Sequence, residues 1–431
     1  MTNTSMNKND DSRLFASIKF LPFIFILVLS VFFFTACERN TYTTSIESEK
    51  KFALEYGSFE NETKLYSVNA GTDFFSGIYM SDGLFYISDS NSKKVMMLSS
   101  YGDLLAVYFN PETNPVPSFI QFSEIQESDS GNPSKKATQR ATSFPFQKPE
   151  RIAVDKRKYL YISDYVPEER YETSTDGKQL LRQIVLRFSN DGTFIDYIGQ
   201  QGSGGMPFPY IEHLYTTSKN ELVVTCADND GFTAFWYSED GFLLYKIPVN
   251  YHSLPVPESM ASQQVMTSLS GIVPDANDYK LYLLIDYSKN EYDESSKVQF
   301  GISYVQSMLY PLNIITGTYE QPQVIPSYEQ IIVNDLSRQV YLVPYEFLGT
   351  TESGWFFFVV ADSEGSSLLM VNPDGQKVLT RRLSINLAEM NYYTLSLSEE
   401  GIISGLFSEE TEASVTWWRT DRIINSLNPG K

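Results

Sequence analysis

The feature that most constrains this chain is a repeated pattern of short apolar strands that end on an acidic residue. After that residue come a turn, another strand, a Gly-containing turn and a further strand, as in GIYMSDGLFYISDSNSKKVMMLSSYGDLLAVY at residues 77–108. The turns are rich in Asn, Asp and Gly, which tolerate the positive φ of tight hairpins. The acidic strand-end residues lie 47 to 76 positions apart and are Asp89, Asp164, Asp228, Asp286, Asp362 and Glu409.

Six irregular repeats of this kind predict an all-β fold, a six-bladed β-propeller with four strands per blade. Aromatic residues make up 14% of the chain, which favours half-buried strands. No segment after residue 60 has a long helical period. A pair of β-sandwiches is the competing architecture, and the number of repeats disfavours it. We place the propeller at residues 61–427, with a polar insertion at about 110–145. We expect a strand near Lys64–Val68 to close the ring against the last blade.

Residues 146–211 resemble an NHL repeat and its junction to the next blade, and the other repeats match this pattern in part. The resemblance implies a six-bladed propeller of the NHL or TolB-like kind. It rests on Phe146, Pro149, Ile152–Asp155, Tyr161–Asp164, Ile184–Phe188, Asp191–Gly192, Ile198–Gly199, Gly202–Gly205 and Phe208–Pro209.

The first 36 residues have the anatomy of a secretory signal, with basic residues before the apolar run FLPFIFILVLSVFFFTA. Phe34-Thr35-Ala36-Cys37 resembles the lipobox of bacterial lipoproteins, with Phe34 where Leu is usual. The resemblance implies cleavage before Cys37 and acylation of Cys37, which would anchor the chain to a membrane of the cell envelope. The alternative is an uncleaved N-terminal membrane anchor. Residues 37–60 are expected to form a tether with one short helix around Glu47–Tyr56.

The formal net charge of −20 argues against a nucleic-acid partner and against adsorption to anionic lipid without a covalent anchor. If Cys37 is acylated, Cys226 has no partner within the chain, and its apolar surroundings predict a buried thiol. Two histidines are too few for a histidine-rich metal site, and no cofactor is indicated.

The repeated acidic residues have two interpretations. They could form a ring of carboxylates that binds a cation or amine at one mouth of the propeller. They could instead order the turns by accepting backbone N–H groups, which explains the repetition by itself and is the interpretation that we favour.

Two of these turns are long and similar to each other. Asp164-Tyr165 and Asp286-Tyr287 both lead into acidic hairpins, each with a second tyrosine, Tyr171 or Tyr292. If the blades are assigned correctly, both hairpins leave the same face, where tyrosines could contact a partner. The alternative is a pair of solvated hairpins without a partner.

Arg151 and His213 hold similar places at the start of an inner strand. Both could point into the central channel and meet an anionic ligand, although a structural role is the simpler interpretation. We therefore expect a non-catalytic binding or scaffold propeller for a protein or small ligand. The alternative is a propeller hydrolase or lyase that uses a divalent metal in the channel, for which we find no matching motif.

Overall fold

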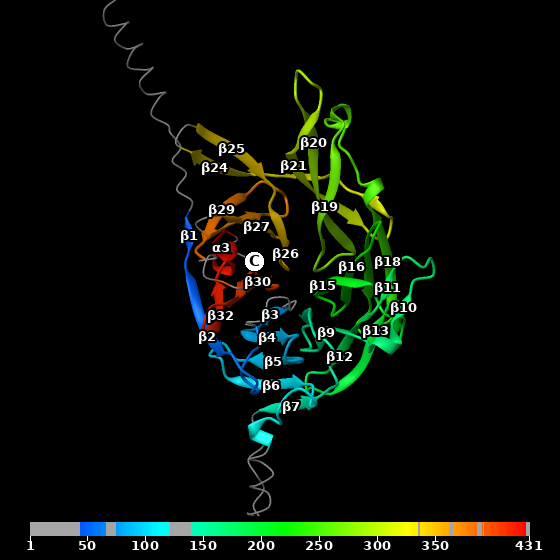
Figure 1. Cartoon of the computed structure of the whole chain (residues 1–431), viewed down its shortest axis with the longest axis vertical. Coiled ribbons are helices and arrows are strands. Elements are labelled where there is room, and N and C mark those ends of the chain that lie inside the picture. The colour runs from blue at the N-terminus through cyan, green and yellow to red at the C-terminus, as the bar shows by residue number, and fades with distance from the viewer. Residues whose placement is uncertain are drawn as a thin grey trace, which may run out of the picture. The chain divides into compact units, whose positions relative to one another are not determined.

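The computed structural model describes residues 44–65, 75–120, 139–334, 337–362, 365–385, 390 and 392–427. Six antiparallel sheets stand around a common axis as the six blades of a β-propeller (Figure 1). Each sheet packs an apolar face against both neighbours, so its middle strands are apolar throughout. In β5 (Lys94–Leu98), for example, Met96 packs toward the blade before and Val95 toward the blade after.

The blades follow the chain, and in each the first strand named is the innermost. Blade 1 contains β3 (Ile78–Ser81), β4 (Leu84–Asp89), β5, β6 (Leu104–Phe109) and β7 (Arg140–Ser143). Blade 2 contains β8 (Ile152–Val154), β9 (Leu160–Tyr165), β12 (Gln183–Phe188), β13 (Phe194–Gly199) and β14 (Gly202–Ser203). Blade 3 contains β15 (Tyr210–Thr216), β16 (Leu222–Ala227), β17 (Gly231–Tyr237) and β18 (Leu243–Asn250).

Blade 4 contains β19 (Met266–Pro274), β20 (Lys280–Tyr292), β21 (Gln299–Asn313), β22 (Thr318–Tyr319) and β23 (Gln323–Ile325). Blade 5 contains β26 (Glu346–Thr350), β27 (Phe356–Asp362), β28 (Gly365–Val371), β29 (Val378–Leu383) and, at its outer edge, β1 (Ser45–Ile46). Blade 6 contains β30 (Tyr392–Leu397), β31 (Ile403–Ser408), β32 (Glu412–Trp418) and, outermost, β2 (Ser48–Glu55).

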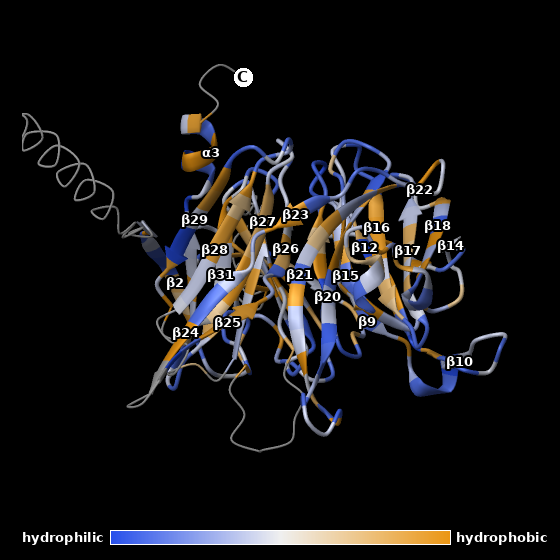
Figure 2. Cartoon of the chain, turned by 90° about the horizontal axis from the view of Figure 1, so that it is seen from above, coloured by the Kyte–Doolittle hydropathy of each residue, from blue (hydrophilic) through white to orange (hydrophobic). Residues whose placement is uncertain are grey.

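The two faces of the ring differ in what they carry. We call the side on which β4 and β9 end the loop face, and the opposite side the turn face. The loop face bears the hairpin of β10 (Glu172–Thr173) and β11 (Leu180–Leu181), the long ends of β20 and β21, and the hairpin of β24 (Tyr328–Asn334) and β25 (Ser337–Val343) (Figure 2). The turn face carries short hairpin turns and the helix α3 (Asp421–Leu427). No helix in the part of the chain that the structure describes is long and apolar enough to cross a bilayer.

The prediction of a six-bladed propeller is confirmed, but the strand that closes the ring is not the expected one. β2 pairs antiparallel with β32, so the N-terminal strand completes the last blade. Residues 48–55 are therefore a strand and not a helix within a tether. Phe52 and Leu54, two positions apart, are buried while Ala53 is exposed, which is the period of a strand with one face in the core. Of the expected closing strand, Lys64 and Leu65 are described outside any sheet and residues 66–68 lie outside the described residues.

Two further segments differ from the sequence prediction. The end of the polar insertion forms β7, which adds a parallel fifth strand to blade 1. Residues 328–343, between blades 4 and 5, form the separate hairpin β24–β25, which the repeat pattern did not predict. Within the insertion, residues 121–138 lie outside the described residues.

Candidate functional site

A cavity of about 450 Å³ lies at the centre of the ring. All six innermost strands contribute to its wall, β3, β8 and β26 through their loop-face ends and β15, β19 and β30 through residues further along the strand. Its volume is within the range of pockets that hold small organic molecules. The lining residues are Gly77–Tyr79, Arg151–Ile152, His213–Tyr215, Ser270–Gly271, Glu346–Leu348, Val359, Ala361, Ser366 and Tyr393–Leu397.

Arg151 is the positive charge of this cavity. Its backbone is fixed just before β8, where its N–H donates to Ser163 Oγ at 2.8 Å and its carbonyl accepts from Ser163 N at 2.9 Å. Its guanidinium lies over the ring of Phe75, 4.3 Å from the centroid. Among the described residues it has no carboxylate within ion-pair distance, and its buried Nε has no hydrogen-bond partner. Arg151 thus brings to the cavity wall a guanidinium without an ion-pair partner among the described residues, and its inaccessible Nε is an unsatisfied donor.

His213 lies on β15, also in the cavity wall. Its imidazole is exposed to the lumen yet surrounded by protein, with its ring 5.7 Å from that of Tyr215. This desolvation, reinforced by the positive charge of Arg151, lowers the pKa of His213 well below its ordinary value. The imidazole is therefore neutral at pH 7 and offers one N–H donor and one acceptor. The prediction that Arg151 and His213 share the channel wall agrees with the structure.

Glu346 at the start of β26 brings a carboxyl group to the opposite part of the wall. Its pKa is raised by burial, with no contribution from Arg151. Glu212, beside His213 in sequence, has a pKa that burial raises and the charge of Arg151 lowers. Arg151 of blade 2 thus acts on the carboxyl group of Glu212 in blade 3, while Glu346 lines the cavity from blade 5.

An ion pair spans the axis of the ring at the turn face. Lys156 follows β8 in blade 2 and Glu352 follows β26 in blade 5, which is the opposite blade, and their Nζ and Oε1 atoms are 2.7 Å apart. Glu399 of blade 6 lies 3.9 Å from the same ammonium group, and burial raises its pKa to about 7. The side chain of Asn277 in blade 4 donates to the carbonyl of Glu352 at 2.9 Å. Four blades thus meet across this mouth, whereas the cavity lies nearer the loop face.

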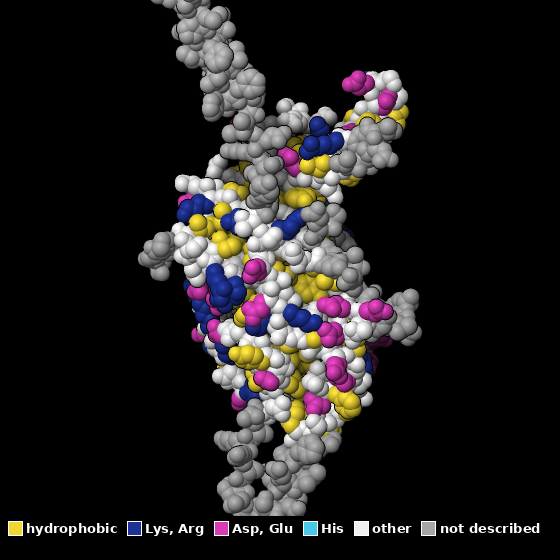
Figure 3. All heavy atoms as spheres, turned by 90° about the vertical axis from the view of Figure 1, so that its left-hand side faces the viewer, with side chains coloured by type: hydrophobic (Ala, Val, Ile, Leu, Met, Phe, Trp, Pro, Cys, Tyr) yellow, Lys and Arg dark blue, Asp and Glu magenta, His cyan; other side chains and the backbone are white. Residues whose placement is uncertain are grey.

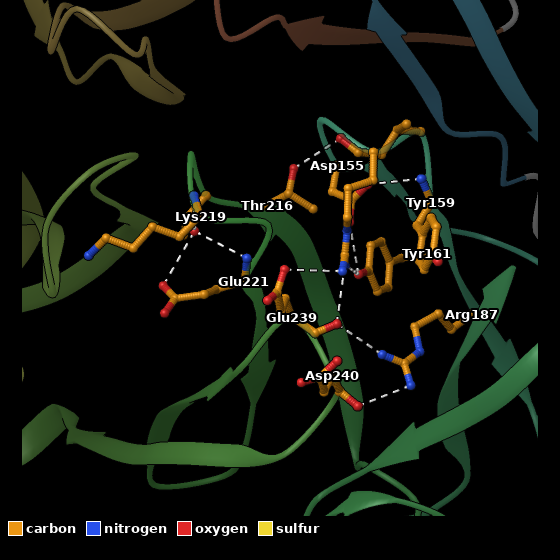
Figure 4. Close-up of polar contacts among 12 residues, drawn as sticks. Asp155, Tyr159, Tyr161, Arg187, Thr216, Lys219, Glu221, Glu239 and Asp240 are labelled. Carbon is orange, nitrogen blue, oxygen red and sulfur yellow. Dashed lines mark hydrogen bonds and ion pairs between the residues drawn. The ribbon is translucent and has the colours of Figure 1, made fainter. Parts of the chain in front are cut away.

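Polar contacts near the turn face also hold blade 2 to blade 3 (Figure 4). Arg157 pairs with the buried Asp155 at 2.7 Å and with Glu239 of blade 3 at 3.2 Å. Arg187 binds Asp196 in its own blade and donates to the carbonyls of Glu239 and Asp240, each at 3.1 Å. These contacts fix the spacing of the two blades that carry Arg151 and His213.

The repeated acidic residues lie within their own blades and not in the cavity wall. Asp89 accepts the backbone N–H groups of Lys64 at 2.7 Å and Ser92 at 3.0 Å. Asp228 accepts the N–H of Asp230 at 2.9 Å. This geometry is the one expected if these carboxylates order turns. The side chain of Asp362 lies outside what the structure describes, and Glu409 accepts the hydroxyl of Ser414 at 2.7 Å.

Asp164 and Tyr165 help to line a second hollow of about 310 Å³ on the loop face of blade 2. Burial raises the pKa of Asp164 to about 7, although the N–H groups of Gln147 and Lys148 bind its carboxylate and oppose that shift. Apolar side chains, among them those of Phe144 and Phe194, supply much of the remaining wall. Tyr171 is half-buried against the apolar cluster between blades 1 and 2.

The two tyrosines predicted as contact residues in the second hairpin, Tyr287 and Tyr292, lie in different environments. Tyr287 is fully buried, and its hydroxyl donates to the carbonyl of Pro255 at 2.7 Å, so the structure places it in the core and not on a binding surface. Asp286 is also buried and accepts the hydroxyls of Ser270 and Ser307. Tyr292 is 53% exposed near the end of the β20–β21 hairpin. Both long hairpins do leave the loop face.

Two other predictions concern single cysteines and metals. Cys226 is buried and free, as its apolar context predicts, and desolvation raises the pKa of its thiol. Cys37 lies outside the described residues. Within the described ranges, no three His, Cys, Asp or Glu side chains lie together as a metal site would require.

Sequence reasoning missed Phe75, Glu346 and the Lys156–Glu352 pair. Glu346 is the first residue of the inner strand β26, as Arg151 directly precedes the inner strand β8, so an alignment of the six repeats could have found it. The Lys156–Glu352 pair joins residues 196 positions apart and needs the ring itself.

No known family pattern matches this sequence, and no curated protein is significantly similar to it. Among solved structures, a gluconolactonase from Xanthomonas campestris is similar with a TM-score of 0.38 and 11% identity, over 87% of this chain and 97% of that chain. A polysaccharide lyase of the PL25 ulvan lyase family has a TM-score of 0.38 and 10% identity, over 86% and 83%. A streptogramin B lyase has a TM-score of 0.34 and 11% identity, over 86% and 97%. Likenesses this distant carry no argument about activity.

Proposed function

We propose that this chain is an exported, lipid-anchored binding protein whose central cavity holds a small organic anion. A carboxylate, a sulfate or a phosphate group is the chemical class that fits the cavity. The observation that carries the proposal is Arg151, a cation at the cavity wall with an unsatisfied buried Nε and no acidic partner among the described residues.

The Nε donor of Arg151 carries a free-energy cost as long as it has no acceptor. A buried donor without a partner costs about 1–3 kcal/mol, and more for a charged group. A ligand oxyanion would accept from the planar guanidinium, which suits carboxylates, sulfates and phosphates because it can donate two parallel hydrogen bonds. Neutral His213 supplies a further donor without adding charge.

The anchoring part of the proposal rests on the sequence. Residues 1–36 have the order of a secretory signal, and Cys37 follows a small residue as lipidation requires. The chain carries a net charge of −20, which would keep it away from anionic lipid unless a covalent anchor held it there.

The anion-binding proposal is tested by isothermal titration calorimetry of the purified protein with sulfate, inorganic phosphate and benzoate at constant ionic strength. At least one of the three is expected to bind, and Arg151→Gln should weaken that binding by about tenfold or more, the loss of one charge-assisted contact. Arg381→Gln, on the outer strand β29, is the matched control and should leave binding unchanged. Equal binding by wild type and Arg151→Gln would refute the assignment, and binding only in the presence of added calcium or zinc would favour a metal-dependent hydrolase.

The anchor is tested separately by fractionating cells that express wild type or Cys37→Ala. Wild type should appear in the membrane fraction at the processed size, and the variant should lose both processing and lipid labelling. A variant that stays with membranes at the unprocessed size would mean that the N-terminal segment is an ordinary membrane anchor.

A further inference from the structure

The hairpin β24–β25 stands apart from the six blades. Its two strands pair only with each other among the described residues, with Ile331 opposite Val340 and Glu329 opposite Leu342. A two-stranded ribbon with open edges is marginally stable alone in water and normally needs a surface to cover it.

The ribbon is also unusually apolar for an exposed element. Ile331 is 47% exposed, Val340 52%, Tyr341 47% and Leu342 45%. Ile331, Val340 and Leu342 share one face, because cross-strand partners and alternate residues point the same way. Glu329 and Arg338 border them on that face, and Tyr341 lies on the other. Single exposed apolar residues are ordinary, but a contiguous set of this kind marks a contact surface.

The adjoining hairpin of blade 4 extends this apolar surface. Beyond the body of the blade, Val298, Phe300 and Ile302 of the β20–β21 hairpin are 61%, 68% and 63% exposed. They follow one another at every second position, so they line one side of the hairpin. Both hairpins project from the loop face, and β21 and β25 contact each other.

The short segment between Cys37 and the first strand indicates that the membrane covers this surface. Seven peptide units join Cys37 to Thr44, and such a segment spans at most about 25 Å when fully extended. The chain enters the ring through β1 at the outer edge of blade 5, and β24–β25 is the connection that leads into that same blade. Figure 1 shows β24, β1 and β2 in the same half of the ring, and Figure 2 shows β24 and β2 on one side of it, with β24 nearer the loop face. An acylated Cys37 would therefore hold this side of the propeller close to the bilayer.

We propose that the β24–β25 ribbon, through the face that carries Ile331, Val340 and Leu342, is a membrane-contact surface that rests on the lipid to which the chain is tethered. The inference depends on the lipid anchor of the proposed function. The contact is apolar, since the net charge of −20 opposes attraction to anionic headgroups. It should therefore form on zwitterionic lipid and should not weaken as salt is added. Figure 3 shows charged and apolar side chains interspersed on the side of the ring where the chain enters, without a continuous basic patch.

The test uses the acylated protein reconstituted on phosphatidylcholine vesicles whose acyl chains carry bromine, which quenches tryptophan fluorescence on contact. Leu342→Trp places a reporter on the same face of the ribbon as Val340, at a position that is 45% exposed. Tyr101→Trp, at a position 84% exposed on a turn of blade 1, is the matched control. Three of the four native tryptophans, Trp236, Trp355 and Trp418, are fully buried and supply a constant background.

The expected result is strong quenching of the Leu342→Trp reporter, little quenching of the control, and loss of the quenching when Val340 is also changed to Asp. If the protein floats with the vesicles but the reporter is not quenched, the ribbon is not a lipid contact and the inference is overturned while the anchor stands. If the protein does not float, the anchor itself has failed. If Val340→Asp instead dissociates a dimer in analytical ultracentrifugation, the ribbon is covered by a second copy, which also overturns the inference.

Discussion

Ring closure by β2 makes a quantitative prediction for Phe52→Ala. Phe52 is 8% exposed and packs in the cluster between blades 6 and 1, with its ring edge-on to that of Phe85 at 5.5 Å between centroids. It lies on β2, the strand near the N-terminus that pairs with β32 of the last blade and so closes the ring. Its removal therefore weakens both the cluster and the closure.

The expected cost is about 3–5 kcal/mol, the usual range for truncating a buried phenylalanine, and the aromatic pair accounts for about 0.5–1.5 kcal/mol of it. The site cannot collapse easily, because the backbone of Gly102 already lies against the Phe52 ring: a Cβ at that glycine would come within 3.0 Å of the Phe52 Cγ. The cost should therefore not fall below this range.

Urea unfolding followed by tryptophan fluorescence measures this loss. Trp417 on β32 is a local reporter, because its indole N–H donates to Glu49 of β2 at 2.8 Å. The matched control is Glu55→Ala, an exposed side chain on the same strand, which should change the free energy of unfolding by less than about 0.5 kcal/mol. If Phe52→Ala costs no more than Glu55→Ala, then β2 does not close the ring and the reasoning is wrong.

Three further results are expected. Arg187→Met should lower the free energy of unfolding by about 2–3 kcal/mol in urea melts, because it removes the cation that pairs with Asp196 and leaves the carbonyl of Asp240 in the next blade without its donor. His213→Gln should reduce the loss of thermal stability below about pH 6.5: the His213 pKa is lowered in the fold, so the unfolded chain takes up the proton first as pH falls. Melts at pH 5 and pH 8 measure the difference. Cys226 should not react with a thiol reagent until the protein is unfolded in urea, because it is buried and its thiolate is disfavoured.

The fold could be predicted because the strands of one propeller blade are close together in sequence. Each blade folds from consecutive residues, so the strand, acidic residue and turn recur along the sequence and can be counted. The strand β2 could not be assigned in this way, since its partner β32 lies more than 350 residues away and its own sequence, SEKKFALE, buries only two side chains, Phe52 and Leu54. A polar segment of this kind has the pattern of a helix or tether until its partner is known.

The candidate site was predicted only in part. The start of an inner strand points to the channel in any propeller, which is why Arg151 and His213 were identified from position alone. Tyr287 was wrong as a contact residue because a tyrosine beside an acidic strand end can equally face the neighbouring blade, and that choice depends on the register. The bulge between Leu269 and Gly271, in the strand paired with Tyr287, is one such irregularity of register.

The ion pair between Lys156 and Glu352 has a kinetic consequence. Because it bridges the axis, it narrows the turn-face mouth, and we expect a molecule in the central cavity to enter and leave by the loop face. The residence time of a ligand in the cavity then depends on the loop-face opening. A loop that covers this opening slows ligand association and dissociation equally and leaves the equilibrium affinity unchanged. Substitutions around the loop-face opening should alter the rate constants of ligand association and dissociation, whereas substitutions at Arg151 should alter the equilibrium affinity.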